Sequence, residues 1–157
     1  MKISLIGAGN LATHLGRALA DAGNSIELVY SRTMESAIRL ATLLGCDAQN
    51  DISKINTDSD LYVLSVSDAV LPELVPQLCK GRGNGIFIHT AGSISLDVFR
   101  GHADRYGVVY PMQTFSKDRQ LDFSKIPCFI EASDEDTLDN LMALCRQISN
   151  DVVVMTS

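Results

Sequence analysis

A glycine-rich turn near the start of the chain constrains the fold more than any other feature. Residues 7–12 read Gly-Ala-Gly-Asn-Leu-Ala and come directly after the apolar run Ile3–Ile6. Apolar side chains then recur every three or four residues as far as Ala22, which is typical of an amphipathic helix. The apolar run Ile26–Tyr30 follows, so the turn is expected to join a buried strand to a helix that leads into a second strand.

Small residues in this turn meet specific physical demands. Gly7 permits a tight backbone bend, Gly9 leaves room for a ligand close to the backbone, and Ala12 lets the helix lie close to the strand. The first turn of the helix also offers unpaired N–H groups and the positive end of the helix dipole. This arrangement favours a bound dinucleotide, although a turn that merely connects strand and helix is the alternative. The candidate pyrophosphate contacts are Gly7, Ala8, Gly9, Asn10, Leu11 and Ala12.

Strand and helix patterns alternate along the rest of the chain. Helices are expected at Met34–Leu44, at 69–80, where Pro76 predicts a short or kinked helix, and after Ser133, which precedes an acidic first turn. The alternation predicts an α/β fold with a doubly wound, mainly parallel sheet, extra strands at the C-terminal end, and one domain over residues 1–157. Cys46–Ala48 is expected as a short third strand, and the other apolar runs that suit buried strands are Leu61–Val66, Ile86–His89, Gly107–Tyr110, Cys128–Glu131 and Val152–Met155.

The residues that follow the second strand bear on the choice of dinucleotide. An NAD enzyme has an Asp or Glu at the end of this strand, where it accepts hydrogen bonds from the ribose 2′-hydroxyl. This chain has Ser31, Arg32 and Thr33 there, and Glu27, near the start of the strand, is interpreted as structural. A guanidinium and two hydroxyls suit a 2′-phosphate, which predicts NADP rather than NAD. In the alternative, Arg32 is a solvated loop residue and Thr33 only a helix cap.

Loops after the fourth and fifth strands are expected to flank the nicotinamide, because ligands of such sheets bind at the carboxyl ends of the strands. His89 is the best-placed titratable group for proton transfer, and its alternative role is to orient its loop through backbone contacts. Asp68 has helix capping as its alternative, and Pro111 and Met112 either shape the pocket wall or pack in the core. The candidate contacts in these loops are Val66, Ser67, Asp68, Thr90, Ala91 and Gly92.

Composition narrows the expected partners. The formal net charge of −6 opposes nonspecific binding to nucleic acid or to anionic lipid, so a phosphate must be held by local geometry. The apolar runs are shorter than the ~20 residues that span a bilayer. The four cysteines form no metal-binding spacing with the histidines. We therefore expect a cytoplasmic protein with reduced thiols, no metal, and neither nucleic acid nor membrane as a partner.

Several segments together carry a family resemblance. They are the glycine turn, Ser31-Arg32-Thr33, Leu64–Asp68, His89-Thr90-Ala91-Gly92 and Val109–Phe115. With them, almost the whole chain resembles NADP oxidoreductases related to pyrroline-5-carboxylate reductase, 6-phosphogluconate dehydrogenase-like enzymes and deazaflavin-dependent NADP oxidoreductases. The resemblance implies a Rossmann-fold NADP-binding half. It also implies a helical C-terminal domain, absent from this sequence, that supplies substrate and homodimer contacts.

Taken together, the residues and the resemblance predict the NADP(H)-binding domain of an oxidoreductase. Its reaction would transfer hydride between the nicotinamide and a small carbonyl or imine substrate. A noncatalytic NADP-binding sensor or regulatory module is the alternative, because the same fold carries many unrelated functions.

Overall fold

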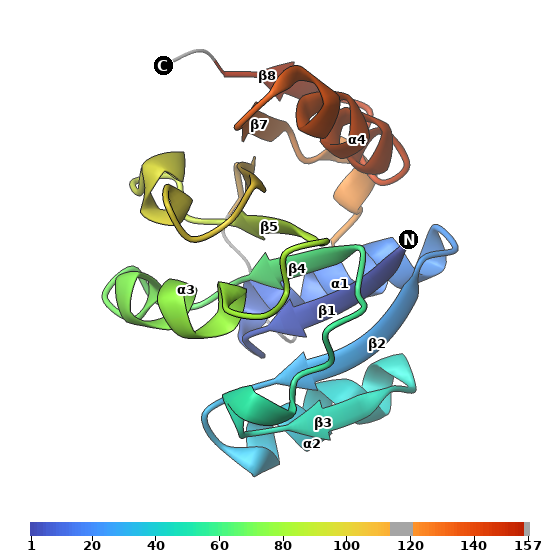
Figure 1. Ribbon diagram of the computed structural model, residues 1–157. Helices are drawn as coiled ribbons and strands as arrows, with labels where there is room; N and C mark the ends of the chain where they lie inside the picture. Colours follow the sequence, from blue (N-terminus) through green and yellow to red (C-terminus); the bar gives the residue numbers. More distant parts are fainter. Residues whose placement is uncertain (114–120, 156–157) are drawn as a thin grey trace.

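Eight strands form one sheet in the order β3-β2-β1-β4-β5-β6-β7-β8 (Figure 1). The structure is a computed structural model that describes residues 1–113 and 121–155. Neighbouring strands are parallel except β6 and β7, which are antiparallel. This confirms the predicted doubly wound, mainly parallel α/β sheet with β7 and β8 added at its C-terminal end. The strands are β1 (Lys2–Ile6), β2 (Ser25–Tyr30), β3 (Asp47–Gln49), β4 (Leu61–Leu64), β5 (Ile86–His89), β6 (Arg105–Pro111), β7 (Cys128–Ala132) and β8 (Val152–Val154).

Helices cover both faces of the sheet. The first face carries α1 (Asn10–Asp21), α2 (Met34–Leu44) and α4 (Glu135–Arg146), and the second carries α3 (Leu71–Cys79). In Figure 1, α2 lies with β3 at one edge of the sheet and α4 lies with β8 at the opposite edge. Short 3-10 turns complete the two layers: η1 (Ile52–Lys54) and η2 (Leu96–Phe99) on the α3 side, and η3 (Phe123–Lys125) on the α1 side.

Strand residues alternate between two apolar cores. Leu61 and Val63 of β4 pack in the core under α1, whereas Tyr62 and Leu64 pack in the core under α3. Because both faces of β4 are covered, its sequence is a continuous apolar run rather than an alternating one. Each such fully buried side chain stabilises the fold by about 1.5–3 kcal/mol relative to an exposed one.

Helix boundaries follow the predicted signals closely. α2 has the predicted bounds, and Gly45 ends it in the left-handed conformation with φ +70°. α3 is short, with Pro72 in its first turn and Pro76 inside it. The helix expected after Ser133 has Asp134 as its N-cap, because the Asp134 carboxylate accepts a hydrogen bond from the Thr137 amide at 2.7 Å.

A register shift between β1 and β2 explains Glu27. Ile3 pairs with Ile26 whereas Ser4 pairs with Leu28, so Glu27 is the extra residue of a β-bulge. The bulge lies inside the strand, away from its carboxyl end, and this agrees with the structural interpretation of Glu27.

The segment from Tyr110 to Phe115 is described only in part. Pro111 is buried in β6, as its core-packing interpretation expects, while Met112 is 51% exposed. Thr114 and Phe115 lie outside the described residues. Within the part of the chain that the structure describes, no helix has the length and apolar character needed to cross a membrane.

Candidate cofactor-binding site

A cleft lies at the carboxyl ends of β1, β2 and β4, whose arrows point to the same side in Figure 1. Its volume is about 460 Å³, which lies in the range of small-molecule sites. Three segments that are far apart in the sequence meet there: the glycine turn, the start of α2 and the loop after β4. The predicted residues that line it are Gly7, Ala8, Ser31, Arg32, Thr33, Val66 and Ser67.

The opposite wall of the cleft comes from residues that the sequence motifs did not indicate. Ile52, Val70 and Leu74 offer an apolar surface that suits a flat adenine ring. Glu73 and Gln77 of α3 add polar groups. No spacing in the sequence links these residues to the glycine turn, because they reach it only through the order of the strands.

The glycine turn has the predicted tight bend. Gly7 has φ +119°, and its amide donates to the Tyr30 carbonyl oxygen at 2.8 Å. A Cβ atom at Gly7 would lie 2.1 Å from the Ser65 carbonyl oxygen, so no other residue fits there. A Cβ atom at Gly9 would meet nothing within 4 Å. The turn therefore packs tightly on its Gly7 side and is open on its Gly9 side, where a ligand can approach the backbone.

The start of α1 is left available to an anion. Gly9 is its N-cap, with no side-chain hydrogen bond, and the first turn holds no acidic residue. By contrast, the Thr33 hydroxyl caps α2 by accepting from the Ser36 amide at 3.4 Å. Leu11 is half-buried and Ala12 is 1% exposed, so Ala12 acts through close packing of α1 on the sheet rather than through ligand contact. These observations fit a pyrophosphate at this helix start.

Arg32 is exposed at the mouth of the cleft, and among the described residues it forms no salt bridge. Thr33 does cap α2, as its alternative interpretation expected. Its hydroxyl accepts one hydrogen bond and keeps a proton to donate, so the two roles of Thr33 are compatible.

Hydrogen bonds tie the loops after β4 and β5 together. The Thr90 hydroxyl donates to Ser65 Oγ at 3.3 Å, and the Ser93 hydroxyl donates to the Asp68 carboxylate at 2.8 Å. The capping alternative for Asp68 is wrong, because the N-cap of α3 is Val70, without a side-chain bond. Gly92 packs closely against the Tyr110 side chain, since a Cβ atom there would lie 2.8 Å from the ring.

The contacts of His89 favour its loop-orienting interpretation. The side chain is fully buried, and Nδ1 accepts from the Ala91 amide at 3.1 Å. Nε2 therefore carries the proton and donates to the Ser95 carbonyl oxygen at 3.3 Å. Burial lowers the pKa of His89, so the neutral ring is favoured. A catalytic role for His89 stays a prediction, and its two ring nitrogens are both engaged by backbone.

Arg39 is a further cation beside the glycine turn that the motifs did not indicate. Its Nη2 donates to the Ala8 carbonyl oxygen at 3.3 Å. The side chain comes from α2, three residues after Ser36, which lines the cleft. A basic residue on α2, nearly two helical turns beyond the Ser31-Arg32-Thr33 segment, is the sequence signal that could have identified it.

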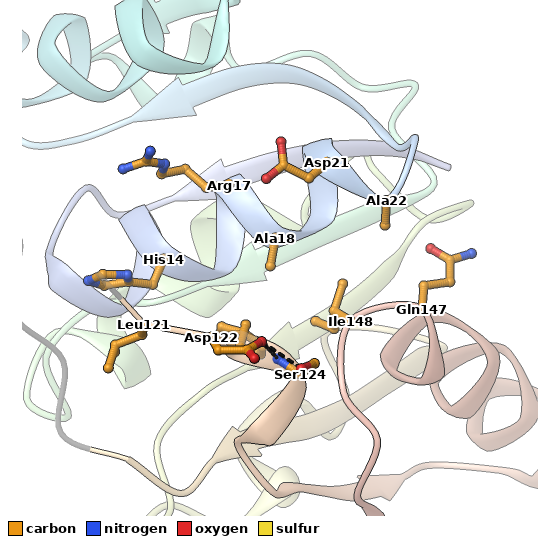
Figure 2. Close-up of a pocket in the computed structure, with 11 residues that line it drawn as sticks. His14, Arg17, Ala18, Asp21, Ala22, Leu121, Asp122, Ser124, Gln147 and Ile148 are labelled. Atoms are coloured by element: carbon orange, nitrogen blue, oxygen red, sulfur yellow. Dashed lines mark hydrogen bonds between the residues drawn. The ribbon is translucent and has the colours of Figure 1, made fainter. Parts of the chain in front are cut away.

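A second hollow, of about 470 Å³, lies along the flank of α1 (Figure 2). His14, Arg17 and Asp21 of α1 border it, opposite residues 121–124 and the end of α4. None of its lining residues belongs to the glycine turn or to the loops after β2, β4 and β5. Its charged lining residues are Arg17, Asp21 and Asp122, and it lacks the glycine turn that offers backbone amides to an anion in the first cleft.

The fold and the glycine turn define the class of protein: a Rossmann domain of the NAD(P)-binding type. Residues 2–91 match the family model described as NADP oxidoreductase, coenzyme F420-dependent, and the chain belongs to this family. A protein from Bacteroides fragilis designated an NADP oxidoreductase is 44% identical in sequence, with a TM-score of 0.95. The match covers 98% of this chain and 60% of that one.

More distant solved structures share the fold. Prephenate dehydrogenase from A. aeolicus is 14% identical, with a TM-score of 0.82, over 99% of this chain and 60% of that one. A pyrroline-5-carboxylate reductase from Coxiella burnetii is 17% identical, with a TM-score of 0.77, over 99% of this chain and 58% of that one. The chain thus spans about 60% of the length of these relatives. No curated protein matches it.

Proposed function

We propose that residues 1–157 are the NADP(H)-binding domain of an enzyme that transfers hydride between the nicotinamide and a small carbonyl or imine substrate. The observation that carries this proposal is that the glycine turn and Ser31, Arg32 and Thr33 line the same cleft. A helical domain elsewhere in the protein would complete the substrate pocket and the homodimer contacts. Such a division agrees with the 60% share of the solved relatives that this chain covers.

The charges around the cleft support NADP over NAD. Arg32 is the guanidinium among the described lining residues, and it follows β2 directly. Glu73 is the carboxylate among them, and it belongs to α3 rather than to the end of β2. A ribose 2′-phosphate beside the end of β2 would therefore meet a cation and hydroxyl donors, whereas an NAD site needs a carboxylate there.

The chain itself contributes binding and orientation. Bound NADP(H) supplies or accepts the hydride at its nicotinamide ring. Amides of the glycine turn and the start of α1 would hold the pyrophosphate, and Val66 and Ser67 would border the ring. His89 would act as a positioning residue that holds the loop of Thr90 and Ala91 in place.

Cofactor preference is tested by fluorescence titration with NADPH and NADH. We expect the parent chain to bind NADPH at least about tenfold more tightly, since hydrogen bonds to charged groups contribute about 1.5–3 kcal/mol each. Arg32→Ala should lose most of this preference by weakening NADPH binding alone. Arg17→Ala removes an exposed guanidinium outside the cleft and should bind as the parent does. Equal binding of both cofactors by the parent chain would refute the proposed NADP site.

Hydride transfer is tested separately with the whole protein. NADPH absorbance is followed while small 2-oxo acids, aldehydes and cyclic imines are supplied in turn. Oxidation of NADPH by one class would identify the substrate chemistry. Tight NADPH binding without turnover of any of them would favour the noncatalytic sensor instead.

A further inference from the structure

The position of Arg39 links α2 to the glycine turn. Its guanidinium donates to the Ala8 carbonyl oxygen at 3.3 Å, and Ala8 lines the cleft. Ser36, one turn earlier on α2, lines the cleft as well. The guanidinium of Arg39 therefore lies between two elements that build the candidate cofactor site.

Arg39 does not form the ion pair that its position on α2 would favour. Glu35 precedes Arg39 by four residues, a spacing and order that favour an ion pair on a helix. No salt bridge joins the two within the described part of the chain. Arg39 is directed to the glycine turn instead, where a single neutral carbonyl oxygen occupies one of its five donors.

Helix geometry accounts for the direction of the Arg39 side chain. Side chains on an α-helix lean toward its N-terminus, so Arg39 extends back toward the turn of α2 that holds Ser36 and Thr33. That turn follows Arg32, the expected 2′-phosphate cation. The side chain of Arg39 is exposed, so it can exchange its carbonyl partner for an anion by rotating its own bonds.

We propose that Arg39 is a second cation for the 2′-phosphate of NADP, which raises specificity for NADP over NAD; this rests on the proposed function. A phosphate is a stronger partner for a guanidinium than a neutral carbonyl oxygen, because the hydrogen bonds are charge-assisted and can be bidentate. The formal net charge of −6 makes the overall field unfavourable to such an anion, so nearby cations matter more. Arg39 would leave Ala8 when the phosphate binds.

Two other roles of Arg39 predict a different pattern. If it only tethers the glycine turn through Ala8, its loss disturbs a site that NADPH and NADH share. If it binds the pyrophosphate, the loss is again shared, since both cofactors carry that group. Only a 2′-phosphate contact changes the ratio of the two affinities, so the ratio distinguishes the proposal from both alternatives.

The experiment compares Arg39→Gln, Arg39→Lys and the matched control Arg17→Gln in NADPH and NADH titrations. We expect Arg39→Gln to weaken NADPH binding about tenfold while NADH binding stays within twofold of the parent, because one charge-assisted contact is lost. Arg39→Lys should recover part of the NADPH affinity, since it keeps the charge but not the bidentate geometry. Arg17→Gln should change neither cofactor's affinity.

The outcomes separate this inference from the proposed function. A parent chain without NADPH preference overturns both. A parent that prefers NADPH, loses the preference in Arg32→Ala and keeps it in Arg39→Gln overturns only the role of Arg39. An equal loss of NADPH and NADH binding in Arg39→Gln also overturns it, in favour of a tether or a pyrophosphate contact.

Discussion

Two helices of this fold, α1 and α4, have the same place between two parallel strands but differ at their N-terminal ends. α1 and α4 both have 12 residues, both follow a strand, and both lead into a further strand parallel to the one they follow. They also pack on the same side of the sheet. α1 begins at Gly9 without a side-chain cap or an acidic first turn. α4 begins at Asp134, whose carboxylate accepts from Thr137, and continues with Glu135 and Asp136.

The difference is the one expected between a helix start that binds an anion, as proposed for α1, and a helix start that is only structural. At α4, the chain's own carboxylates satisfy the amide donors and the helix dipole, so an approaching anion would meet negative charge. At α1, no side chain caps the helix start and the first turn holds no carboxylate, so a phosphate would supply the missing negative charge if it bound there. Under the proposed function, the α1 end lacks capping stability because its donors serve a ligand, whereas the α4 end is stabilised by its own cap.

The largest effect is expected from Gly7→Ala, which would disrupt the glycine turn that leads into α1. The added Cβ atom would lie 2.1 Å from the Ser65 carbonyl oxygen, in a backbone conformation with φ +119°. Strain and overlap together should destabilise the fold by about 3 kcal/mol or more. Urea denaturation followed by circular dichroism measures the loss. Stability close to that of the parent chain would contradict the packing of Gly7 against Ser65, which follows β4.

Gly9→Ala should leave the fold intact and damage only binding. Its Cβ atom would meet nothing within 4 Å, and its φ of −81° suits any residue. Unfolding free energy should stay within about 0.5 kcal/mol of the parent. The methyl group would occupy the space that a pyrophosphate needs, so NADPH binding should weaken more than about tenfold. Unchanged NADPH affinity in a folded Gly9→Ala variant would argue against the phosphate site.

Asp134→Ala tests the capped start of α4. Loss of the cap should destabilise the protein by about 1 kcal/mol, because the Thr137 amide loses its acceptor. NADPH affinity should not change, since α4 lies at the far edge of the sheet from the cleft. The two quantities are read from urea denaturation and cofactor titration of one preparation. A change in NADPH affinity would mean that the two ends are coupled.

The pH dependence of stability gives an independent test of the Asp134 cap. Hydrogen bonding to the Thr137 amide lowers the pKa of Asp134 in the folded protein. A lowered folded-state pKa means that the cap's stabilisation is present above the unfolded value of about 3.9 and is lost as the pH falls through the lower folded value. Asp134→Asn keeps a capping oxygen that does not titrate. Its stability should therefore decline less than that of the parent below about pH 4.

Local signals account for what the sequence predicted well. The glycine turn, the Ser31-Arg32-Thr33 segment and the capped start of α2 each lie within a few consecutive residues, and their physical demands can be read from residue types alone. The mainly parallel sheet could be predicted because strands that alternate with helices are covered on both faces. The boundaries of α2 matched because Thr33 and Gly45 are strong capping residues.

Contacts between distant segments were beyond the reach of the same reasoning. Ile52 and Leu74 line the cleft only because the order of the strands brings η1 and α3 beside β2 and β4. The bond from Arg39 to Ala8 depends on how α2 lies against the glycine turn. The sequence placed His89 at a strand end, but the engagement of both its ring nitrogens by backbone arises from the fold of its loop.

The smallest effect should come from giving α1 the acidic first turn that α4 has. Asn10→Asp places a carboxylate at the first residue of α1, where it interacts favourably with the helix dipole and should stabilise the protein by about 0.3–1 kcal/mol. The same charge would repel a bound pyrophosphate, and a repulsion of about 1 kcal/mol weakens NADPH binding about fivefold. Glu135→Gln is the matched opposite change at α4, with a slight loss of stability and no change in affinity. Opposite signs for stability and binding at α1 would show that the open helix start is kept for the ligand, whereas a gain in both would mean that phosphate does not bind there.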